Sequence, residues 1–169
     1  MTAYFVLVAA VAVERLVELV VSTRHARWAF ARGGVEYGAG HFRVMAGVHA
    51  ALLVSCVAEV AVADRPFLPW LGWPMLALVL AAQALRWWCV ATLGNQWNTR
   101  VIVVPGLPLV TRGPYRWLRH PNYLAVTVEI AALPLVHTAW VTALVFTVAN
   151  AAVLSVRIPV EERALATVR

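Results

Sequence analysis

Long apolar stretches separated by short polar connections dominate the chain. Three such stretches in the first half each approach the roughly 20 residues that a helix needs to cross a membrane core about 30 Å thick. They cover residues 3–21, 42–63 and 68–93. A further apolar stretch, 124–156, is too long for one crossing at about 1.5 Å per residue, and Pro134 disfavours helix near its middle. The pattern predicts an all-α integral membrane protein with about five transmembrane helices, the last two forming a hairpin.

The composition agrees with a membrane protein. Of the 169 residues, 62% are hydrophobic and 13% are charged, and the mean hydropathy is +0.76; soluble domains carry about 25% charged residues. All 14 basic residues are Arg, and the net charge is +6. Basic residues gather in the cytoplasmic loops of membrane proteins, so this balance requires no anionic partner. We therefore expect the lipid bilayer as a partner and no nucleic acid.

The distribution of Arg along the chain predicts an orientation. Most Arg residues lie in the connections 22–43 and 94–119 and in the tail from Arg157, whereas the loops at the opposite ends of the helices hold only Arg65. This bias places the first two regions and the C-terminus in the cytoplasm and the N-terminus outside. We expect a single membrane domain over residues 1–169, with a three-helix frame over 1–93 and a second half over 94–169.

Charged residues also occur within the predicted spans. Glu14, Arg15 and Glu18 interrupt the first span, and Arg86 lies in the third. Charges at membrane depth are costly, so these side chains are expected to face the bundle interior. Two interpretations stay open: a structural set of ion pairs, or the wall of a pocket for a polar substrate head, with Glu14 and His49 as substrate-binding candidates.

Two Arg-bearing clusters border the last apolar stretch. They are Arg112–Tyr123 and Arg157–Glu162. If 124–156 folds back on itself, both clusters meet at the same membrane face. Arg157 and Glu161 are four residues apart and share a helical face. A cation and an anion held together at this membrane face suit a zwitterionic ligand.

The backbone around His120 and the connection before it also suggest a site. Pro121 keeps His120 out of the helical conformation and can itself start a helix, whose free N–H groups favour an anion. Further upstream, Thr99–Val104 is expected to be extended, with Leu107–Thr111 returning beside it. We expect this connection to lie at the membrane interface and to cap the bundle.

These motifs resemble those of the isoprenylcysteine carboxyl methyltransferase family, integral membrane enzymes that use S-adenosylmethionine. The resemblance covers about residues 99–165 and rests on Gly113-Pro114-Tyr115-x-x-x-Arg119-His120-Pro121-Asn122-Tyr123 followed by Arg157-x-x-x-Glu161-Glu162. It implies that Arg157 faces the methyl acceptor. It also implies cofactor contacts by Leu107, Pro108, Leu109, Val110, Tyr115, His120, Pro121, Asn122, Tyr123 and Glu161.

The first half has fewer spans than the eukaryotic members and is similar to a small bacterial branch of that family. The similar stretches are Arg32–His49 and Thr99–Gly106. That branch includes O-methyltransferases for alkylpyrones and alkylresorcinols. The resemblance therefore implies methyl transfer to a hydroxyl or carboxyl oxygen of a lipidic acceptor, in a bacterial cell membrane, with residues 94–169 as the cofactor-binding and catalytic half.

The candidate catalytic residues are Arg157 and His120. Arg157 is expected to hold the acceptor oxyanion by charge-assisted hydrogen bonds. His120 or His49 is a candidate base for a weakly acidic hydroxyl, whereas an acidic enol or phenol needs none. The histidine spacing predicts no metal site.

Two other function classes stay open. A membrane reductase of the sterol-reductase type shares an Arg-His-Pro-x-Tyr-like motif but uses NADPH. A non-enzymatic membrane scaffold would explain the charges at depth, Glu14, Glu18 and Arg86, without any chemistry. The sequence leaves the oligomeric state open.

Overall fold

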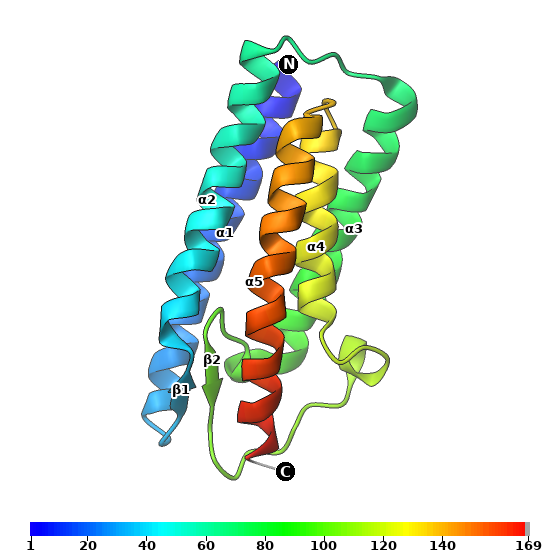
Figure 1. Ribbon diagram of the computed structural model, residues 1–169. Helices are drawn as coiled ribbons and strands as arrows, with labels where there is room; N and C mark the ends of the chain where they lie inside the picture. The colour runs from blue at the N-terminus through cyan, green and yellow to red at the C-terminus, as the bar shows by residue number, and fades with distance from the viewer. Residues whose placement is uncertain (168–169) are drawn as a thin grey trace.

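The computed structural model describes residues 1–167, which form an elongated bundle of five helices (Figure 1). The helices are α1 (Thr2–Phe30), α2 (Ala39–Val62), α3 (Pro69–Leu93), α4 (Pro121–Leu135) and α5 (Trp140–Ala166). Two short 3₁₀ helices, η1 (Gly94–Gln96) and η2 (Gly113–Arg116), and two short strands, β1 (Val35–Tyr37) and β2 (Val101–Val103), lie in the connections. The mostly helical architecture predicted from the sequence is confirmed. Arg169, one of the tail residues in the orientation argument, lies outside the described residues.

Three of the helices are long and apolar enough to cross a membrane. They are α2, α3 together with η1 (Pro69–Gln96), and α5. The other two differ for physical reasons: α1 carries three charges within its apolar stretch, and α4 has only 15 residues. The chain is an integral membrane protein.

The first helix is longer than predicted. The connection expected from Ser22 onward is helical as far as Phe30. No Gly or Pro interrupts this part, and its Ala and Arg residues are good helix formers. The turn after Phe30 contains Gly33, which adopts φ +76°, and the N–H of Gly34 donates to the carbonyl of Ala29 at 2.9 Å.

The extended connection pairs with a different partner from the one expected. β2 lies within the predicted extended run, but it pairs antiparallel with β1, with Val101 opposite Tyr37 and Val103 opposite Val35. The expected return of Leu107–Thr111 beside it is wrong, because this segment forms no strand. The two-stranded sheet thus joins the α1–α2 connection to the connection that follows α3.

The predicted break in the last apolar stretch is confirmed. α4 ends at Leu135, Thr138 adopts φ +54°, and α5 begins at Trp140. Thr138 Oγ1 donates to the carbonyl of Pro66 at 2.8 Å, so this turn is fastened to the α2–α3 connection. α5 then continues through Pro159 to the other end of the bundle, where the C-terminus and both strands lie (Figure 1).

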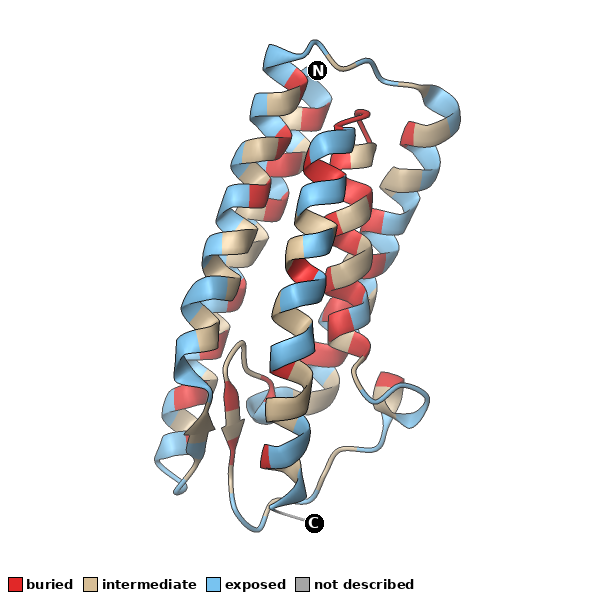
Figure 2. Ribbon diagram, viewed as in Figure 1, coloured by how far each residue is buried: buried red, intermediate tan, exposed pale blue. Residues whose placement is uncertain are grey.

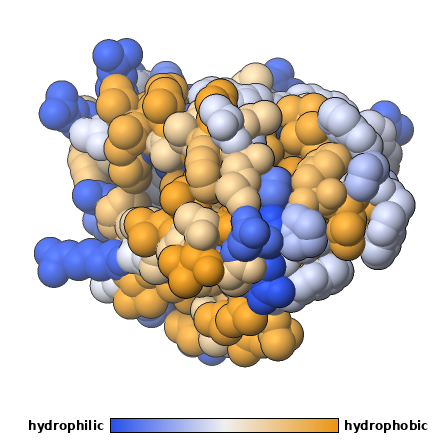
Figure 3. Space-filling model, turned by 90° about the horizontal axis from the view of Figure 1, so that it is seen from above, coloured by the Kyte–Doolittle hydropathy of each residue, from blue (hydrophilic) through white to orange (hydrophobic). Residues whose placement is uncertain are grey.

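The apolar core occupies the half of the bundle that is remote from the strands. It includes Val8 of α1, Leu52 and Cys56 of α2, and Ile130 and Leu133 of α4. Buried positions line the inner faces of the helices, while their outer faces are largely exposed (Figure 2). Seen along the bundle, broad hydrophobic areas cover much of the surface, and hydrophilic side chains project at only a few places (Figure 3). The outer faces of the helices carry exposed large apolar side chains, such as Val13, Leu80 and Leu144, which suit a lipid environment.

Candidate active site

The two Arg-bearing clusters meet at the strand-bearing end of the bundle, as predicted. Arg157 Nε on α5 donates to the Tyr123 hydroxyl on α4 at 2.9 Å. His120 Nδ1 lies 3.5 Å from a Glu161 carboxylate oxygen, and Nε2 lies 3.4 Å from one of Glu162. The Tyr123 hydroxyl donates to Glu161. We call these five residues, His120, Tyr123, Arg157, Glu161 and Glu162, the mouth cluster.

Arg157 is a buried cation without a carboxylate partner. It is 4% exposed, and its other hydrogen bond goes from Nη2 to the carbonyl of Thr99. Although Glu161 lies one helical turn away, no carboxylate among residues 1–167 forms an ion pair with Arg157. The Tyr123 hydroxyl instead bridges the two side chains. A buried guanidinium without a counter-charge is costly, so this arrangement suits an anionic ligand.

Two adjoining cavities flank the mouth cluster. The inner chamber, of about 250 Å³, extends from Arg157 to Arg86 and has apolar walls that include Met45 and Leu154. The outer chamber, of about 430 Å³, lies against β2 and the loop that follows it. Tyr115, Arg119, His120 and Glu161 line both chambers. The shared wall means that ligands in the two chambers would lie next to each other.

The structure brings most of the sequence-predicted site residues to these chambers. Those that line the outer chamber are Leu107, Leu109, Val110, Tyr115, His120 and Glu161. Those that line the inner chamber are His49, Tyr115, His120, Asn122, Tyr123, Arg157 and Glu161. Pro108 and Pro121 line neither. Glu14 lines neither as well: its carboxylate accepts hydrogen bonds from Trp87 Nε1, at 2.6 Å, and from Gln83.

The two candidate bases have different surroundings. The carboxylate of Glu161, 3.5 Å away, raises the pKa of His120 above its usual value, although partial burial opposes this shift. A histidine that is held protonated between two carboxylates is a poor base. His49 Nδ1 lies 2.8 Å from the carbonyl of Met45 and must donate to it. Its Nε2 is then free to accept a proton, and His49 lines the inner chamber.

Polar residues beyond the predicted set also reach the inner chamber. Trp97 and Asn98, which follow η1, line it, as does Asn150 of α5. Asn150 Nδ2 donates to Thr127 Oγ1 of α4 at 3.2 Å, the kind of interhelical bond expected of an amide inside a membrane bundle. Nothing in the sequence singled out Trp97, because it lies in a connection with no recognisable motif.

Three buried polar atoms near the mouth cluster have no hydrogen-bond partner within residues 1–167. They are His120 Nδ1, Asn122 Oδ1 and Trp97 Nε1. Buried polar groups in proteins are nearly always paired, so atoms of this kind that border a cavity indicate a place for a polar ligand. In the described part of the chain, no group of three or more His, Cys, Asp or Glu residues is placed to hold a metal ion.

A second set of charged residues lies at the inner end of the inner chamber. Arg15 Nη1 is 2.7 Å from Glu18, and Arg86 Nη2 is 3.1 Å from Glu129 on α4. Arg15 Nη2 also lies 3.3 Å from Glu14 and 3.2 Å from Glu129. We call these five residues, Glu14, Arg15, Glu18, Arg86 and Glu129, the inner cluster. It confirms that the charges of the first half face the bundle interior.

Comparison with known proteins identifies the family. The model of the isoprenylcysteine carboxyl methyltransferase (ICMT) family matches residues 75–167. The chain is 38% identical to the uncharacterized protein YpbQ of Bacillus subtilis, over 96% of each chain. It is 27% identical to an uncharacterized protein of Haemophilus influenzae, over 89% of this chain and 88% of the relative. The chain therefore belongs to the isoprenylcysteine carboxyl methyltransferase family of membrane methyltransferases.

Proposed function

We propose that this protein transfers a methyl group from S-adenosylmethionine to an oxygen of a lipidic acceptor, of the alkylpyrone or alkylresorcinol type. One observation carries the proposal. Two chambers share a wall at the mouth cluster, and Arg157 in the apolar inner chamber is a buried cation without a carboxylate. A site of this design suits a polar cofactor on one side and an oxyanion with an apolar tail on the other.

The outer chamber suits the cofactor. Its volume falls in the range of small-molecule pockets. Glu161 and Glu162 would hold the cofactor's ammonium group, and Arg119 and protonated His120 its carboxylate. His120 Nδ1, which has no hydrogen-bond partner within residues 1–167, belongs to a residue that lines this chamber and fits such a polar group. The bound cofactor supplies an electrophilic methyl group on a positively charged sulfur.

The inner chamber suits the acceptor. Arg157 would hold the reacting oxygen as an anion that faces the wall shared with the outer chamber, where the cofactor would lie. The apolar walls of the inner chamber would exclude water. For a weakly acidic hydroxyl, His49 Nε2 is the better placed proton acceptor, because its Nδ1 hydrogen is held by the carbonyl of Met45. The carbonyl of Thr99 and the Tyr123 hydroxyl fix the guanidinium of Arg157 from two sides.

The proposed function includes a membrane orientation. α1 and α4 join the three apolar helices as spans, because their charges pair with one another inside the bundle. The Arg bias then places the N-terminus outside the cell and the mouth cluster in the cytoplasm. The cofactor would enter from the cytoplasm and the acceptor from the bilayer.

Ligand binding tests the cofactor part of the proposal. We expect the detergent-purified protein to bind S-adenosylhomocysteine saturably in a calorimetric titration and not to bind NADPH. Binding of NADPH alone would favour the reductase, and binding of neither would favour a scaffold. Incubation with methyl-labelled cofactor and with an alkylpyrone or alkylresorcinol then tests transfer, with labelled product as the readout.

A substitution tests the role given to Glu161. Glu161→Gln removes the negative charge and should weaken binding of S-adenosylhomocysteine about 10-fold, the loss of one charge-assisted hydrogen bond. Asp64→Asn, which removes an exposed carboxylate in the α2–α3 connection at the opposite end of the bundle, is the matched control and should leave the affinity unchanged. Unchanged affinity in Glu161→Gln would remove Glu161 from the cofactor site.

A further inference from the structure

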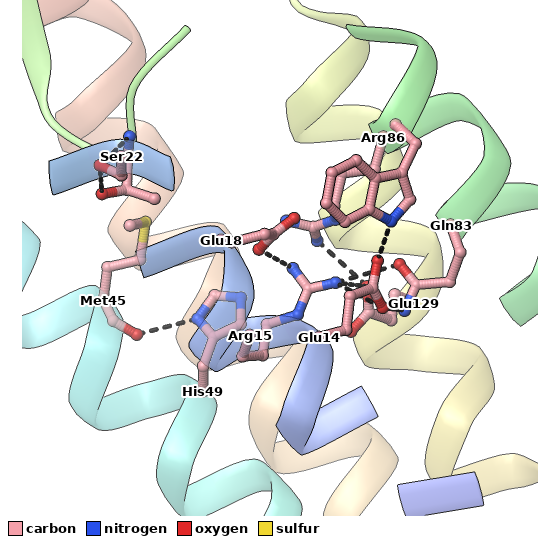
Figure 4. Close-up of polar contacts among 11 residues, drawn as sticks. Glu14, Arg15, Glu18, Ser22, Met45, His49, Gln83, Arg86 and Glu129 are labelled. Carbon is pink, nitrogen blue, oxygen red and sulfur yellow. Dashed lines mark hydrogen bonds and ion pairs between the residues drawn. The ribbon is translucent and has the colours of Figure 1, made fainter. Parts of the chain in front are cut away.

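Part of the inner cluster is open to the inner chamber. Figure 4 shows Arg15, Glu18 and Arg86 converging from α1 and α3 beside His49 of α2. Arg15, Glu18 and Arg86 line the chamber, whereas Glu14 and Glu129 do not. Glu129 is held by both arginines, and Glu14 by Arg15, Gln83 and Trp87. The cluster thus has a closed, structural side and a side that faces the space proposed for the acceptor.

The open side carries polar atoms that the described residues leave unpaired. Glu18 Oε1, Arg15 Nε and Arg86 Nε are buried and have no hydrogen-bond partner within residues 1–167. Glu18 and Arg86 are each 4% exposed, and Glu18 Oε1 lies 3.4 Å from Arg86 Nη1, an ion pair without a hydrogen bond. A purely structural ion-pair network is expected to satisfy its buried polar atoms. One acceptor and two donors at a chamber wall fit a ligand group that bears oxygen.

The spacing between Glu18 and Arg157 limits the size of that ligand. Ser22 follows Glu18 by four residues, a rise of about 6 Å along the helix. Ser22 Oγ lies 2.7 Å from Thr99 Oγ1, and the carbonyl of Thr99 accepts a hydrogen bond from Arg157. The two ends of the chamber are therefore separated by roughly one to two helical turns, about 5–11 Å, which is the span of a single six-membered ring with oxygen substituents.

We propose that the open side of the inner cluster binds a second oxygen of the acceptor ring, while Arg157 holds the oxygen that is methylated. This inference rests on the proposed function and assigns the residues that recognise the second oxygen on the acceptor ring. Glu18 Oε1 accepts a hydrogen bond when the second oxygen is a hydroxyl. The guanidinium groups of Arg15 and Arg86 donate to it when it is a carbonyl. The alkyl tail lies along the apolar wall formed by residues such as Met45 and Leu154.

Substitution at Glu18 tests the proposal with three acceptors of equal alkyl length: a 5-alkylresorcinol, a 4-hydroxy-6-alkyl-2-pyrone and a 3-alkylphenol. For each acceptor, the ratio of kcat/KM in Glu18→Gln to that in the wild type cancels differences in acidity. We expect the ratio to fall about 10-fold for the resorcinol, whose hydroxyl then donates to a neutral amide oxygen in place of a charged carboxylate. The pyrone presents a carbonyl to the arginines and the phenol presents nothing, so both should change by less than about 3-fold.

Glu14→Gln is the matched control, because it removes the same charge from the same cluster at a residue that does not line the chamber. It should leave all three ratios near one. Equal losses for all three acceptors in Glu18→Gln, or no loss for any, would overturn the proposal and leave Glu18 as a structural residue. If Glu18→Gln does not fold, competition in the wild type decides: the resorcinol should be preferred over the phenol by about 10-fold, and parity would overturn the proposal.

The result also separates this inference from the proposed function. Absence of both S-adenosylhomocysteine binding and methylation of all three acceptors would contradict the proposed function itself. Methylation of the phenol and the resorcinol with equal efficiency would leave methyl transfer intact and contradict only the role of the inner cluster.

Discussion

The inner cluster and the mouth cluster contain similar residues, but their arginines are neutralised differently. In the inner cluster, Arg15 and Arg86 each lie within 3.4 Å of carboxylates from more than one helix. In the mouth cluster, Arg157 contacts a phenol and a backbone carbonyl, and the carboxylates of Glu161 and Glu162 face His120 instead. The ion pairs of the inner cluster hold the helices together, whereas Arg157 in the mouth cluster keeps a positive charge that no carboxylate neutralises.

The difference follows from where each cluster lies in the bundle. Charged groups within a membrane bundle are stable only when paired, so charges contributed by α1, α3 and α4 bind these helices together. The mouth cluster lies at the end of the bundle, where a cofactor and an acceptor can supply the missing partners. Breaking a pair should therefore reduce stability in the inner cluster and function in the mouth cluster.

The largest expected effect is on stability. Arg86→Met leaves Glu129, which is 2% exposed, with one of its two arginine partners and Glu18 with a weaker set of contacts. Breaking a buried ion pair in this way should lower the free energy of unfolding by about 3–5 kcal/mol. Denaturation in detergent micelles, followed by circular dichroism, measures it.

The matched control for this substitution is Arg65→Met. Arg65 also pairs with a glutamate, Glu59, at 2.9 Å, but its side chain is 30% exposed in the α2–α3 connection. Loss of an exposed pair should cost about 1 kcal/mol or less. Equal destabilisation by both substitutions would mean that burial of the inner cluster is not what makes its ion pairs important.

The next effect is on turnover. Arg157→Lys keeps the positive charge but loses the planar group that reaches the Tyr123 hydroxyl, the Thr99 carbonyl and the acceptor together. We expect kcat to fall about 10- to 100-fold and the affinity for S-adenosylhomocysteine to change by less than about 3-fold. Single-turnover methylation and a calorimetric titration measure the two quantities.

Arg163→Lys, on the exposed side of the same helix, should change neither quantity. An equal loss of turnover and cofactor affinity in Arg157→Lys would instead place Arg157 in the cofactor site.

Much of the helical frame could be predicted from the sequence because hydrophobic length and proline positions are local signals. The start of α3 and the break near Pro134 follow from such signals. The extension of α1 to Phe30 did not, because its polar composition suggested a loop while its helix propensity was high. The pairing of β1 with β2 links segments more than sixty residues apart, and no local pattern specifies such a partner.

Prediction of the site from the sequence was limited in the same way, because local patterns do not specify contacts between distant segments. The motifs indicated which residues gather at the mouth, because they flank the two ends of one hairpin. The sequence did not show that Tyr123 stands between Arg157 and Glu161, since side chains that share a helical face are free to bond to a neighbouring helix instead. Nor did it assign the inner end of the chamber to Arg15, Glu18 and Arg86, whose positions depend on how α1 and α3 pack.

The smallest expected effect concerns pH and the mouth cluster. The nearby carboxylate of Glu161 raises the pKa of His120, so the folded protein retains the proton at a pH where the unfolded chain has released it. The stabilisation is therefore fully present below the unfolded pKa, about 6.5, and is lost as the pH rises through the higher folded pKa. The difference in unfolding free energy between wild type and His120→Asn should be largest near pH 6 and shrink by pH 9. Because the contacts are long and partly exposed, we expect a difference of about 1 kcal/mol or less, measured by thermal unfolding in detergent.

The control is His41→Asn, which removes a histidine that forms no ion pair within residues 1–167. Its difference from the wild type should not follow this trend with pH. If the difference for His120→Asn instead grows with pH, the imidazole acts as a neutral group and does not neutralise the two glutamates.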